Sequence, residues 1–391
     1  MVSGRRRARL GELVAFKTGK LDSNAGLPNG KYPFFTCSQE TLRTNTYSFD
    51  TECVLLAGNN ANGVYPLKYF NGKFDAYQRT YVVTTRDPQV LTTRFLYYTL
   101  RPMLSQFRSV STGAATKFLT LTILNETEIE VPPLSAQRRI AGILTAYDEL
   151  IENNQRRIKI LEEMARSLYR EWFVHFRFPG HDKVKMVSSR TGFIPEGWEV
   201  KKLGDLTAVL NRGISPTYDD EDGDSTVINQ KCIRGQRLSL EPARRQSKPI
   251  PTDKRIRFGD VLINSTGVGT LGRVAQVYED LDQCTVDTHV TIVRPKADTD
   301  VDFFGCTLLL KQEDFERLGI GATGQTELSR TAIGEVKIPT PPDSLQKRFG
   351  ELARPMRTAA NTLSKQIENL RHTRDLLLPR LLSGLLAKAI S

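Results

Sequence analysis

The fold of this chain is decided by two related stretches: residues 132–173, PPLSAQRRIAGILTAYDELIENNQRRIKILEEMARSLYREWF, and residues 341–377, PPDSLQKRFGELARPMRTAANTLSKQIENLRHTRDLL. Pro133 and Pro342 are 209 positions apart, and the same offset relates Gln137 to Gln346. An offset that holds for about 40 residues indicates an internal duplication and not a chance similarity.

Both stretches carry a heptad repeat. Positions seven residues apart are Ile140, Tyr147, Asn154, Leu161 and Leu168 in the first stretch, and Phe349, Met356, Leu363, Leu370 and Leu377 in the second. This spacing predicts two long helices that pair with each other through these rows. The intermediate seam positions, three residues further on, are partly apolar and partly polar, so the stripe drifts along the helices. The apolar ones are Ile143, Leu150, Met164, Leu352 and Ala359, and the polar ones are Arg157, Gln366 and Thr373. Asn154 is a polar seam residue of the kind that sets the register of a helix pair.

The alternative is that each helix packs only on its own domain. The length of the first helix argues against this, because residues 136–173 would extend about 57 Å at 1.5 Å per residue, which is longer than a domain of this size is wide. Two helices of this length therefore favour a mutual pairing.

Each long segment follows a globular segment, and these segments also correspond. Residues 10–13, LGEL, recur as residues 203–206, LGDL, and residues 52–58 match residues 259–265 as a buried strand that runs into a loop. Runs rich in β-forming residues and broken by Gly, Asn and Asp predict mixed α/β domains, so the expected fold class is α+β. The predicted boundaries are 1–134 for the first domain, 135–178 for the first long helix, 179–197 for a linker, 198–342 for the second domain, and 343–391 for the second long helix and tail.

Composition excludes several classes of protein. The 391 residues carry a formal net charge of +11, 39% are hydrophobic, and the mean hydropathy of −0.35 predicts a soluble globular protein. No apolar run is long enough for a membrane span and the start of the chain lacks the apolar core of a secretory signal, so we expect a cytoplasmic location. The five cysteines are spaced too widely for a disulfide framework or a zinc site, and no metal ligands are predicted.

Two motifs resemble catalytic sites but lack the required context. Residues 267–272, GVGTLG, fit a dinucleotide-binding fingerprint, but the following residues, RVAQVY, read as a strand and not as the helix that would face a phosphate. The triplets EVK at 199–201 and 335–337 would suit a metal-dependent nuclease, but the first half has EIE at 128–130 in place of the second triplet. The sequence therefore predicts no catalytic residues.

Polar and basic loops with interspersed aromatic residues occupy corresponding places in both halves. Asn and Gln pair with adenine, Arg pairs with guanine, and Lys or Thr contacts phosphate, so these loops together favour DNA binding, although each residue alone is also typical of a solvated loop. In the first half the candidates are Asn59, Asn60, Asn62, Lys68, Asn71, Lys73, Tyr77, Gln78, Arg79, Thr116 and Lys117. In the second half they are Arg212, Tyr218, Arg234, Arg244, Arg245, Asn264, Ser265, Thr266, Arg273, Gln325 and Arg330.

The chain resembles the specificity subunit of type I restriction-modification systems. The resemblance spans nearly the whole chain. It lies in PEGW at 195–198 with KLGDL at 202–206, in the Pro-Pro-x-x-x-Gln borders at 132–137 and 341–346, in LYREWF at 168–173, and in LRHTRDLLLPRLLSG at 370–384.

This resemblance implies two target-recognition domains related by a pseudo-two-fold axis, joined by two antiparallel helices that set the spacing between two DNA half-sites. It implies a non-catalytic subunit that binds double-stranded DNA and two methyltransferase subunits, with two motor-nuclease subunits completing the complex. S-adenosylmethionine, ATP and Mg²⁺ would belong to those partners, and none to this chain. Residues that could dock a methyltransferase, or equally pack on the neighbouring domain, are Trp172, Phe173, Phe176, Leu381, Leu382 and Leu385.

Two alternatives remain open. Within the same class, the chain could be the recognition subunit of a type II-like system whose partner fuses methyltransferase and nuclease. Outside it, the chain could be a non-catalytic coiled-coil scaffold that does not bind DNA. Salt-dependent binding to duplex DNA separates the scaffold from both DNA-binding readings, because phosphate contacts weaken as salt rises.

Overall fold

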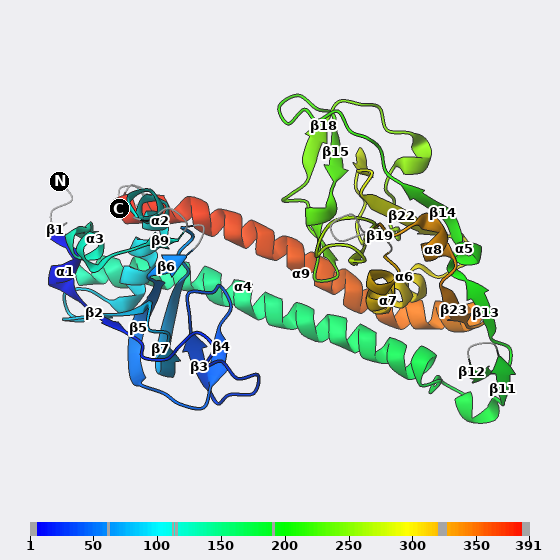
Figure 1. Cartoon of the computed structure of the whole chain (residues 1–391), viewed down its shortest axis with the longest axis horizontal. Helices are drawn as coiled ribbons and strands as arrows, with labels where there is room; N and C mark the ends of the chain where they lie inside the picture. The colour runs from blue at the N-terminus through cyan, green and yellow to red at the C-terminus, as the bar shows by residue number, and fades with distance from the viewer. Residues whose placement is uncertain are drawn as a thin grey trace. The chain divides into compact units, whose positions relative to one another are not determined.

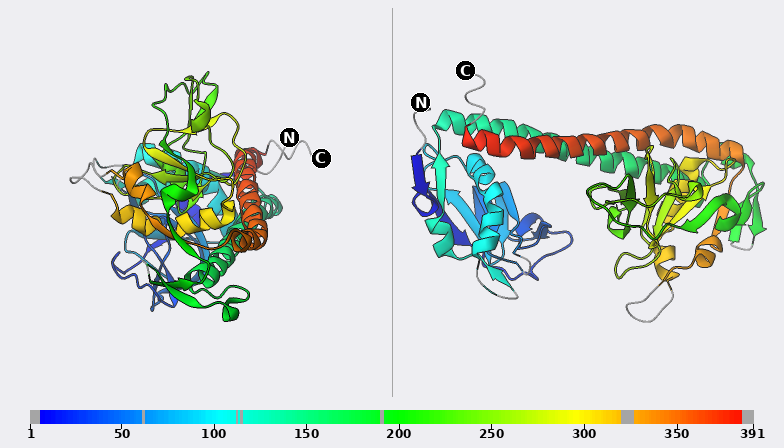
Figure 2. Two further views of the ribbon diagram at one scale, coloured as in Figure 1. Left: turned by 90° about the vertical axis from the view of Figure 1, so that its right-hand side faces the viewer. Right: turned by 90° about the horizontal axis from the view of Figure 1, so that it is seen from above.

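Two long helices and two α+β domains make up the chain (Figure 1, Figure 2). The computed structural model describes residues 6–60, 63–111, 113, 116–189, 192–319 and 327–384. It divides into two compact units, residues 1–152 with 368–391, and residues 153–367. Each unit contains one domain and one stretch of each long helix, α4 (Leu134–Tyr169) and α9 (Asp343–Ser383). The predicted fold class, two α+β domains with two long helices, is confirmed.

The first domain is built around a six-stranded sheet in the order β2-β8-β5-β7-β3-β4. Helix α2 packs on this sheet, and its apolar face, including Phe95, Leu96 and Phe107, lies in the main core of the unit. The elements are β1 (Arg6–Arg9), α1 (Leu10–Leu13), β2 (Val14–Thr18), β3 (Tyr32–Phe35), β4 (Leu42–Thr44), β5 (Phe49–Ala57), β6 (Asn59–Asn60), β7 (Leu67–Ala76), β8 (Thr80–Thr85), α2 (Thr93–Val110), β9 (Lys117–Phe118), α3 (Leu121–Glu126) and β10 (Glu128–Val131).

The second domain has a four-stranded sheet, β14-β22-β19-β20, and a three-stranded sheet, β18-β15-β21. Its helix α6 is buried on most sides and occupies the place that α2 has in the first domain. The elements are β11 (Met186–Ser189), β12 (Gly192–Pro195), β13 (Glu199–Lys202), α5 (Leu203–Leu206), β14 (Thr207–Arg212), β15 (Ser225–Ile228), β16 (Ile233–Arg234), β17 (Arg237–Leu238), β18 (Arg244–Gln246), β19 (Val261–Asn264), β20 (Val274–Gln276), β21 (Cys284–Val286), β22 (Val290–Pro295), α6 (Val301–Leu310), α7 (Gln312–Arg317), α8 (Arg330–Gly334) and β23 (Lys337–Thr340).

The duplication read from the sequence is visible in how each domain begins and ends. In the first domain β1 pairs antiparallel with the last strand, β10, and in the second domain β13, which follows the β11–β12 hairpin, pairs antiparallel with the last strand, β23. The LGEL and LGDL segments form the short helices α1 and α5, which follow β1 and β13 directly. Each domain is therefore closed by its own two ends just before its long helix starts.

Two buried glutamines join each domain to its long helix in the same way. Gln137, on the first turn of α4, accepts a hydrogen bond from the amide of Thr92 (2.9 Å) and donates to the carbonyl of Pro132 (2.9 Å). Gln346, on the first turn of α9, accepts from the amide of Asp300 (3.3 Å) and donates to the carbonyl of Pro341 (3.0 Å). Thr92 and Asp300 are the N-cap residues of α2 and α6, so each glutamine fixes the start of a domain helix to the start of a long helix.

The two long helices are antiparallel where they meet inside the second unit. Asn154 donates to the Gln366 side chain (3.4 Å), and the Tyr169 ring lies 5.8 Å from the Phe349 ring. From the first contact to the second, the residue number increases on α4 and decreases on α9, so the two helices run antiparallel. Asn154 is 2% exposed, so its amide is a buried polar group within an apolar seam.

The structure corrects one half of the predicted seam. Residues of the predicted rows are buried or half-buried, but the second row lies four residues further on and not three. Of the predicted intermediate apolar positions, Leu150, Met164 and Leu352 are between 46% and 48% exposed, whereas Ile143 and Ala359 are half-buried. The buried second-row residues are Leu144, Ile151, Ile158 and Ala165 on α4, and Ala353, Ala360, Ile367, Arg374 and Leu381 on α9. Positions three and four residues away lie on opposite flanks of a helical row, and the position of the partner helix decides which flank is buried.

Candidate nucleic-acid interface

Each domain has a corner where the end of its central strand meets the loop before a short helix. In the first domain the Leu119 amide donates to the Gly58 carbonyl (2.9 Å), and Asn59 pairs with Phe118. In the second, the Leu328 amide donates to the Ser265 carbonyl (2.8 Å), and Thr266 forms the matching bridge with Glu327. The two corners are thus the same backbone arrangement with different side chains.

The first corner brings together five predicted residues from three separate segments. They are Asn59, Asn60, Arg79, Thr116 and Lys117, and none is buried. Gly58 makes this possible, because its amide donates to the Arg79 carbonyl (2.8 Å) and a Cβ atom there would lie 2.7 Å from the same oxygen. The Arg79 guanidinium lies 5.7 Å from the centre of the Phe118 ring, which holds it at this corner.

The second corner brings together Arg212, Thr266 and Arg330. Arg212 forms an ion pair with Glu327 (2.7 Å), and Arg330 donates to the Asn211 side chain (2.9 Å). Thr266 Oγ1 lies 2.7 Å from His289 Nδ1 and accepts from Gln230 (2.9 Å). Arg212 and Arg330 also line one groove with Lys254 and Ser329. Amide, hydroxyl and guanidinium groups of this kind recognise base edges by hydrogen bonds.

Other candidates of the first domain lie elsewhere. Tyr77 and Gln78 are in the turn that leads to Arg79, but Asn71 and Lys73 are on the middle of β7. Lys68 donates to the carbonyls of Ser38 (3.2 Å) and Glu40 (3.0 Å), and burial lowers the pKa of its ammonium group. Lys68 therefore stabilises the loop after β3 by hydrogen bonds to its backbone.

The remaining basic candidates of the second domain form separate groups. Arg244 stacks on the Tyr218 ring (3.9 Å) and pairs with Asp220 (2.7 Å), and Arg245 beside it donates to the Gly223 carbonyl. Arg273 donates to the Gly269 carbonyl within its own glycine-rich turn. The exposed Arg234 lies on the hairpin β16–β17.

Two candidates are inside the domain and not on its surface. Asn264 and Ser265 are both 0% exposed, and Ser265 hydrogen-bonds the hydroxyl of Thr291. They end a fully buried strand, so their side chains cannot reach DNA in this structure. Their sequence alone predicts exposure, because polar residues at the end of a strand resemble an exposed loop. Asn62, Gln325 and Leu385 lie outside the described residues.

Among the predicted docking residues, Trp172, Phe173 and Leu381 are buried, and Phe176 and Leu382 are half-buried. Trp172 and Phe173 follow α4 in a π-helical turn, are 6% and 4% exposed, and pack in the core of the second domain. The Phe176 ring lies 5.3 Å from that of Trp198. Leu381 and Leu382 pack against the core of the first unit.

Sequence reasoning missed several groups at the second corner. Asn211 and Ser329 each precede a predicted arginine, and adjacency could have suggested them. Glu327 and Gln230 carried no such signal, because an acidic residue is not expected near phosphate, and Gln230 meets Thr266 only through tertiary folding.

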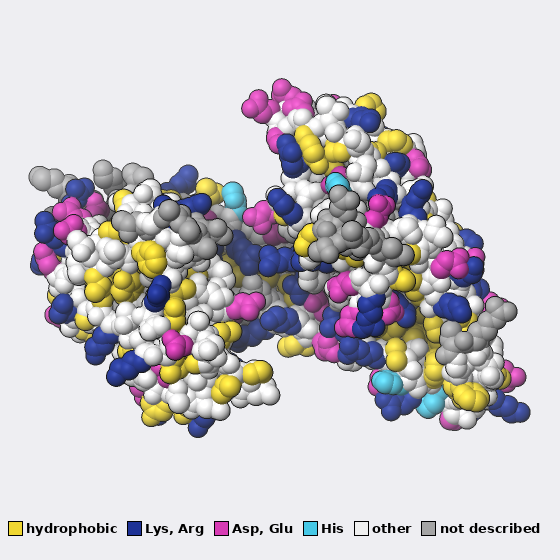
Figure 3. Space-filling view, in the orientation of Figure 1, with side chains coloured by type: hydrophobic (Ala, Val, Ile, Leu, Met, Phe, Trp, Pro, Cys, Tyr) yellow, Lys and Arg dark blue, Asp and Glu magenta, His cyan; other side chains and the backbone are white. Residues whose placement is uncertain are grey.

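The described residues contain no cluster that could hold a metal ion, and none of their helices is long and apolar enough to cross a membrane. The glycine-rich turn at 267–272 is followed by strand β20, as predicted, and Glu335 pairs with Lys202 (2.9 Å). On the face in Figure 3, basic and acidic side chains are mixed over both domains, and Lys and Arg also gather over the long helices. Arg157 and Lys159 are exposed residues of α4.

These features define a duplicated α+β protein whose two domains present hydrogen-bonding side chains at equivalent corners, as expected of a recognition protein. The chain belongs to the family described as type I restriction modification DNA specificity domain, whose sequence profile matches residues 6–163 and 195–370.

Individual relatives agree with this assignment. The chain is 34% identical over 171 residues to the type I restriction enzyme EcoDI specificity subunit of Escherichia coli, a match that covers 44% of this chain but only 37% of that relative. It is 26% identical over 306 residues to the MjaIX specificity subunit of Methanocaldococcus jannaschii, covering 74% and 68% of the two chains. The S subunit of a type I restriction-modification system from M. genitalium shares its fold, with a TM-score of 0.65, 19% identity and 96% of both chains covered.

Proposed function

We propose that this chain reads a bipartite, asymmetric DNA site, with one half-site at each corner. The observation that supports this is the pair of equivalent corners with different side chains. Asn59 of the first corner corresponds to Thr266 of the second, and Arg330 at the start of α8 corresponds to Leu121 at the start of α3. Because Asn suits adenine and Arg suits guanine, two corners with these sets would select different half-sites.

The long helices would set the number of unread base pairs between the half-sites. A continuous α-helix is a stiff element, and α4 contributes one stretch to each unit. Exposed basic residues on the pair, such as Arg157 and Lys159, would contact phosphates of the unread spacer without reading its sequence.

The chain would direct partner subunits to this site. In this proposal, methyltransferase subunits supply adenine methylation with S-adenosylmethionine, and motor-nuclease subunits use ATP and Mg²⁺. The role of this chain is to bind DNA and to position both half-sites for the partner subunits. No catalytic step is assigned to its residues.

The test is adenine-methylation mapping by long-read sequencing of DNA from cells that express this chain with its methyltransferase subunit. We expect one bipartite motif that disappears in cells lacking this chain. Asn60→Ala should relax only the half-site read by the first domain, and Arg330→Ala only the other half, so each variant is the control for the other. Discrimination at the relaxed position should fall by about 1–3 kcal/mol. Methylation that is unchanged without this chain would contradict the proposal and favour the scaffold reading.

A further inference from the structure

The hairpin β16–β17 of the second domain contains a strained turn. Its two central residues, Gly235 and Gln236, have φ angles of 58° and 62°, which is the left-handed geometry of a two-residue type I′ turn. Gly adopts this conformation without cost, but a residue with a longer side chain rarely does. A strained residue persists only where surrounding contacts hold it, so the contacts of Gln236 indicate what the turn is for.

The side chain of Gln236 joins the turn to two helices. Its Nε2 donates to the carbonyl of Leu309 at the end of α6 (2.8 Å), and its Oε1 accepts from the Arg166 guanidinium on α4 (3.0 Å). The amide therefore uses both of its polar atoms, and each contact crosses from the turn to a different helix.

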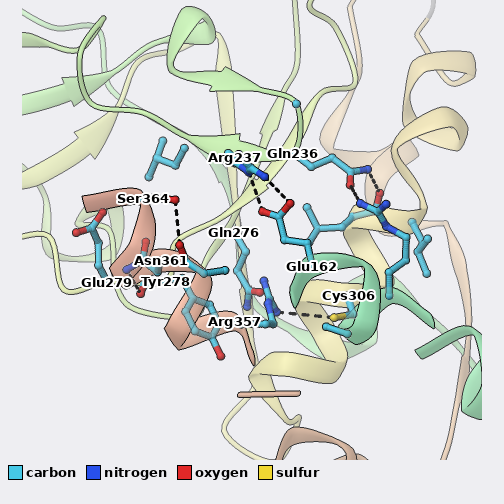
Figure 4. A pocket seen from close by; sticks show the side chains of 17 residues that line it. Glu162, Gln236, Arg237, Gln276, Tyr278, Glu279, Cys306, Arg357, Asn361 and Ser364 are labelled. Atoms are coloured by element: carbon cyan, nitrogen blue, oxygen red, sulfur yellow. Dashed lines mark hydrogen bonds and ion pairs between the residues drawn. The ribbon is translucent and has the colours of Figure 1, made fainter. Parts of the chain in front are cut away.

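The next residue makes a second link to the same long helix. Two nitrogens of Arg237 donate to the two carboxylate oxygens of Glu162 on α4, at 2.7 and 2.6 Å (Figure 4). Glu162 and Arg166 are four residues apart, so they lie on one face of α4 and receive both residues of the turn. A bidentate arginine–carboxylate pair is directional as well as attractive, because both hydrogen bonds require one orientation.

Directional contacts matter here because the packing beside them is incomplete. A cavity of about 150 Å³ lies between the turn, β20, α6 and the two long helices (Figure 4). Gln276 lines this cavity, is 7% exposed, and has a side-chain oxygen with no hydrogen-bond partner among the described residues. Elsewhere Tyr169 and Phe349 of the long helices pack with Phe303 of α6 in the domain core. Beside this cavity the domain and the helices lack such packing, so at this edge the polar contacts of the turn are what orient the domain on α4.

We propose that the Gly235–Gln236–Arg237 turn is a clamp that fixes the angle of the second domain on the helix pair and so makes the complex strict about spacer length. This inference rests on the proposed function. Gln236 and Arg237 are positioning residues in this view: they contact no base, and they act through the helix.

The test uses the full chain assembled with its methyltransferase subunit. The substrates are duplexes in which the two half-sites are separated by the native spacer, or by one base pair more or fewer. Gln236→Gly is the main variant, because Gly suits the left-handed turn while removing both amide contacts. Arg237→Ala and Glu162→Ala remove the ion pair from either side. Arg177→Ala is the matched control, because Arg177 forms a bidentate pair with Glu171 (2.7 Å for both bonds) that stays within the segment after α4.

We expect the wild type and Arg177→Ala to methylate only the native spacer. Gln236→Gly should raise methylation of the altered spacers relative to the native one by about tenfold, without lowering the melting temperature. Arg237→Ala and Glu162→Ala should have equal effects, and the double variant should add nothing, because both remove one pair.

Variants that keep wild-type spacer discrimination would overturn the clamp while leaving the proposed function intact. A uniform loss of methylation at every spacer, or a changed half-site sequence with Arg237→Ala, would also overturn it by indicating a folding or DNA-contact role. A wild-type complex that methylates no bipartite motif would refute the proposed function, and the clamp with it.

Discussion

One set of hydrogen bonds between domain and long helix is the same in both units, and the other contacts between domain and helix differ. The shared set is made by Gln137 and Gln346, whose hydrogen bonds to N-cap amides and proline carbonyls match one for one. The charged contacts and the tyrosine contacts between domain and helix are made by different residues at different positions in the two units. Duplication therefore kept the joint at the start of each helix, while the rest of each interface was built separately.

The charged contacts show the difference most clearly. In the first unit, Asp148 of α4 pairs with Arg374 of α9 (2.6 Å), and its side chain is 27% exposed. In the second unit, Asp302 of α6 is fully buried and contacts Arg354 (2.9 Å) and Arg357 (3.6 Å) of α9. Asp302 is 0% exposed and Arg357 12% exposed, whereas Arg354 is 51% exposed. Loss of the buried carboxylate Asp302 should therefore cost more than loss of Asp148.

The tyrosine contacts are reversed between the units. Tyr98 lies on the domain helix α2 and donates to Asp148 of the long helix (2.8 Å). Tyr169 lies on the long helix α4 and shares a hydrogen bond with Thr307 of the domain helix α6 (2.8 Å). In both units a tyrosine hydroxyl therefore joins the domain helix to α4, but the tyrosine lies on the domain helix in the first unit and on α4 in the second.

The largest predicted effect separates the two charged networks. Asp302→Ala should lower the free energy of unfolding of the second unit by about 3–5 kcal/mol, because it leaves a nearly buried arginine without its carboxylate. Asp148→Ala should cost the first unit less, about 1–2 kcal/mol, because the Asp148 side chain is 27% exposed and its partners keep other contacts. Arg374, although buried, keeps Asp375 at 2.9 Å. Tyr98 keeps Thr145 at 3.3 Å.

Tryptophan fluorescence makes this comparison measurable. Both tryptophans of the chain, Trp172 and Trp198, lie in the core of the second unit, so urea unfolding followed by their emission reports that unit. Hydrogen exchange of residues 93–110 would report the first. Equal losses in the two units would show that burial of the network is not what distinguishes them.

A smaller effect should be shared by both domains. Gln137→Ala and Gln346→Ala should each cost about 2 kcal/mol, because each leaves a part-buried N-cap amide and a buried proline carbonyl without these partners. Gln137→Ala also removes a hydrogen bond to the Val90 carbonyl (2.8 Å). The measurement is hydrogen exchange at the start of α2 and of α6, where protection should fall by a similar factor. Gln137→Glu and Gln346→Glu keep the acceptor and are the matched variants. A loss in only one domain would mean that the two joints are alike in geometry but not in energy.

The smallest effect concerns pH. Burial raises the pKa of both Tyr98 and Tyr169, so the folded protein keeps them neutral while the unfolded chain ionises them near pH 10. Stability should be unaffected by these groups below that pH and should fall above it, by about 1 kcal/mol per tyrosine at pH 10.5. Tyr98→Phe and Tyr169→Phe should each flatten the decline in their own unit, measured as unfolding free energy between pH 8 and 10.5. An unchanged slope would indicate that the hydroxyl is solvated in the folded state.

Much of the fold was predictable because it depends on patterns within single segments of the sequence. The heptad rows through Ile140 and Phe349 and the double prolines are properties of single segments, and so is the buried strand that became β19. The match of Gly58 with Ser265, made on sequence, is the same backbone contact in both domains. The spacing of these patterns also carried the resemblance to the family.

The sequence does not predict which candidate side chains are exposed, because exposure is not a local property. Asn264 and Thr266 are two positions apart, yet one side chain is buried and the other lies at the second corner. Lys68 carries the positive charge expected of a phosphate contact, but its ammonium group donates a hydrogen bond to the Glu40 carbonyl in the loop after β3. The bridges that assemble each corner join segments about 60 residues apart, and no spacing rule relates them.

The sequence by itself determined the duplication, the α+β domains, the two long helices and the family. Only the tertiary structure decided which flank of each helix is buried, which candidate side chains reach the surface, and how the turn at Gln236 meets α4. The physical reason is that periodicity and turn chemistry act between near neighbours in the chain, whereas burial and pairing depend on residues brought together from far apart.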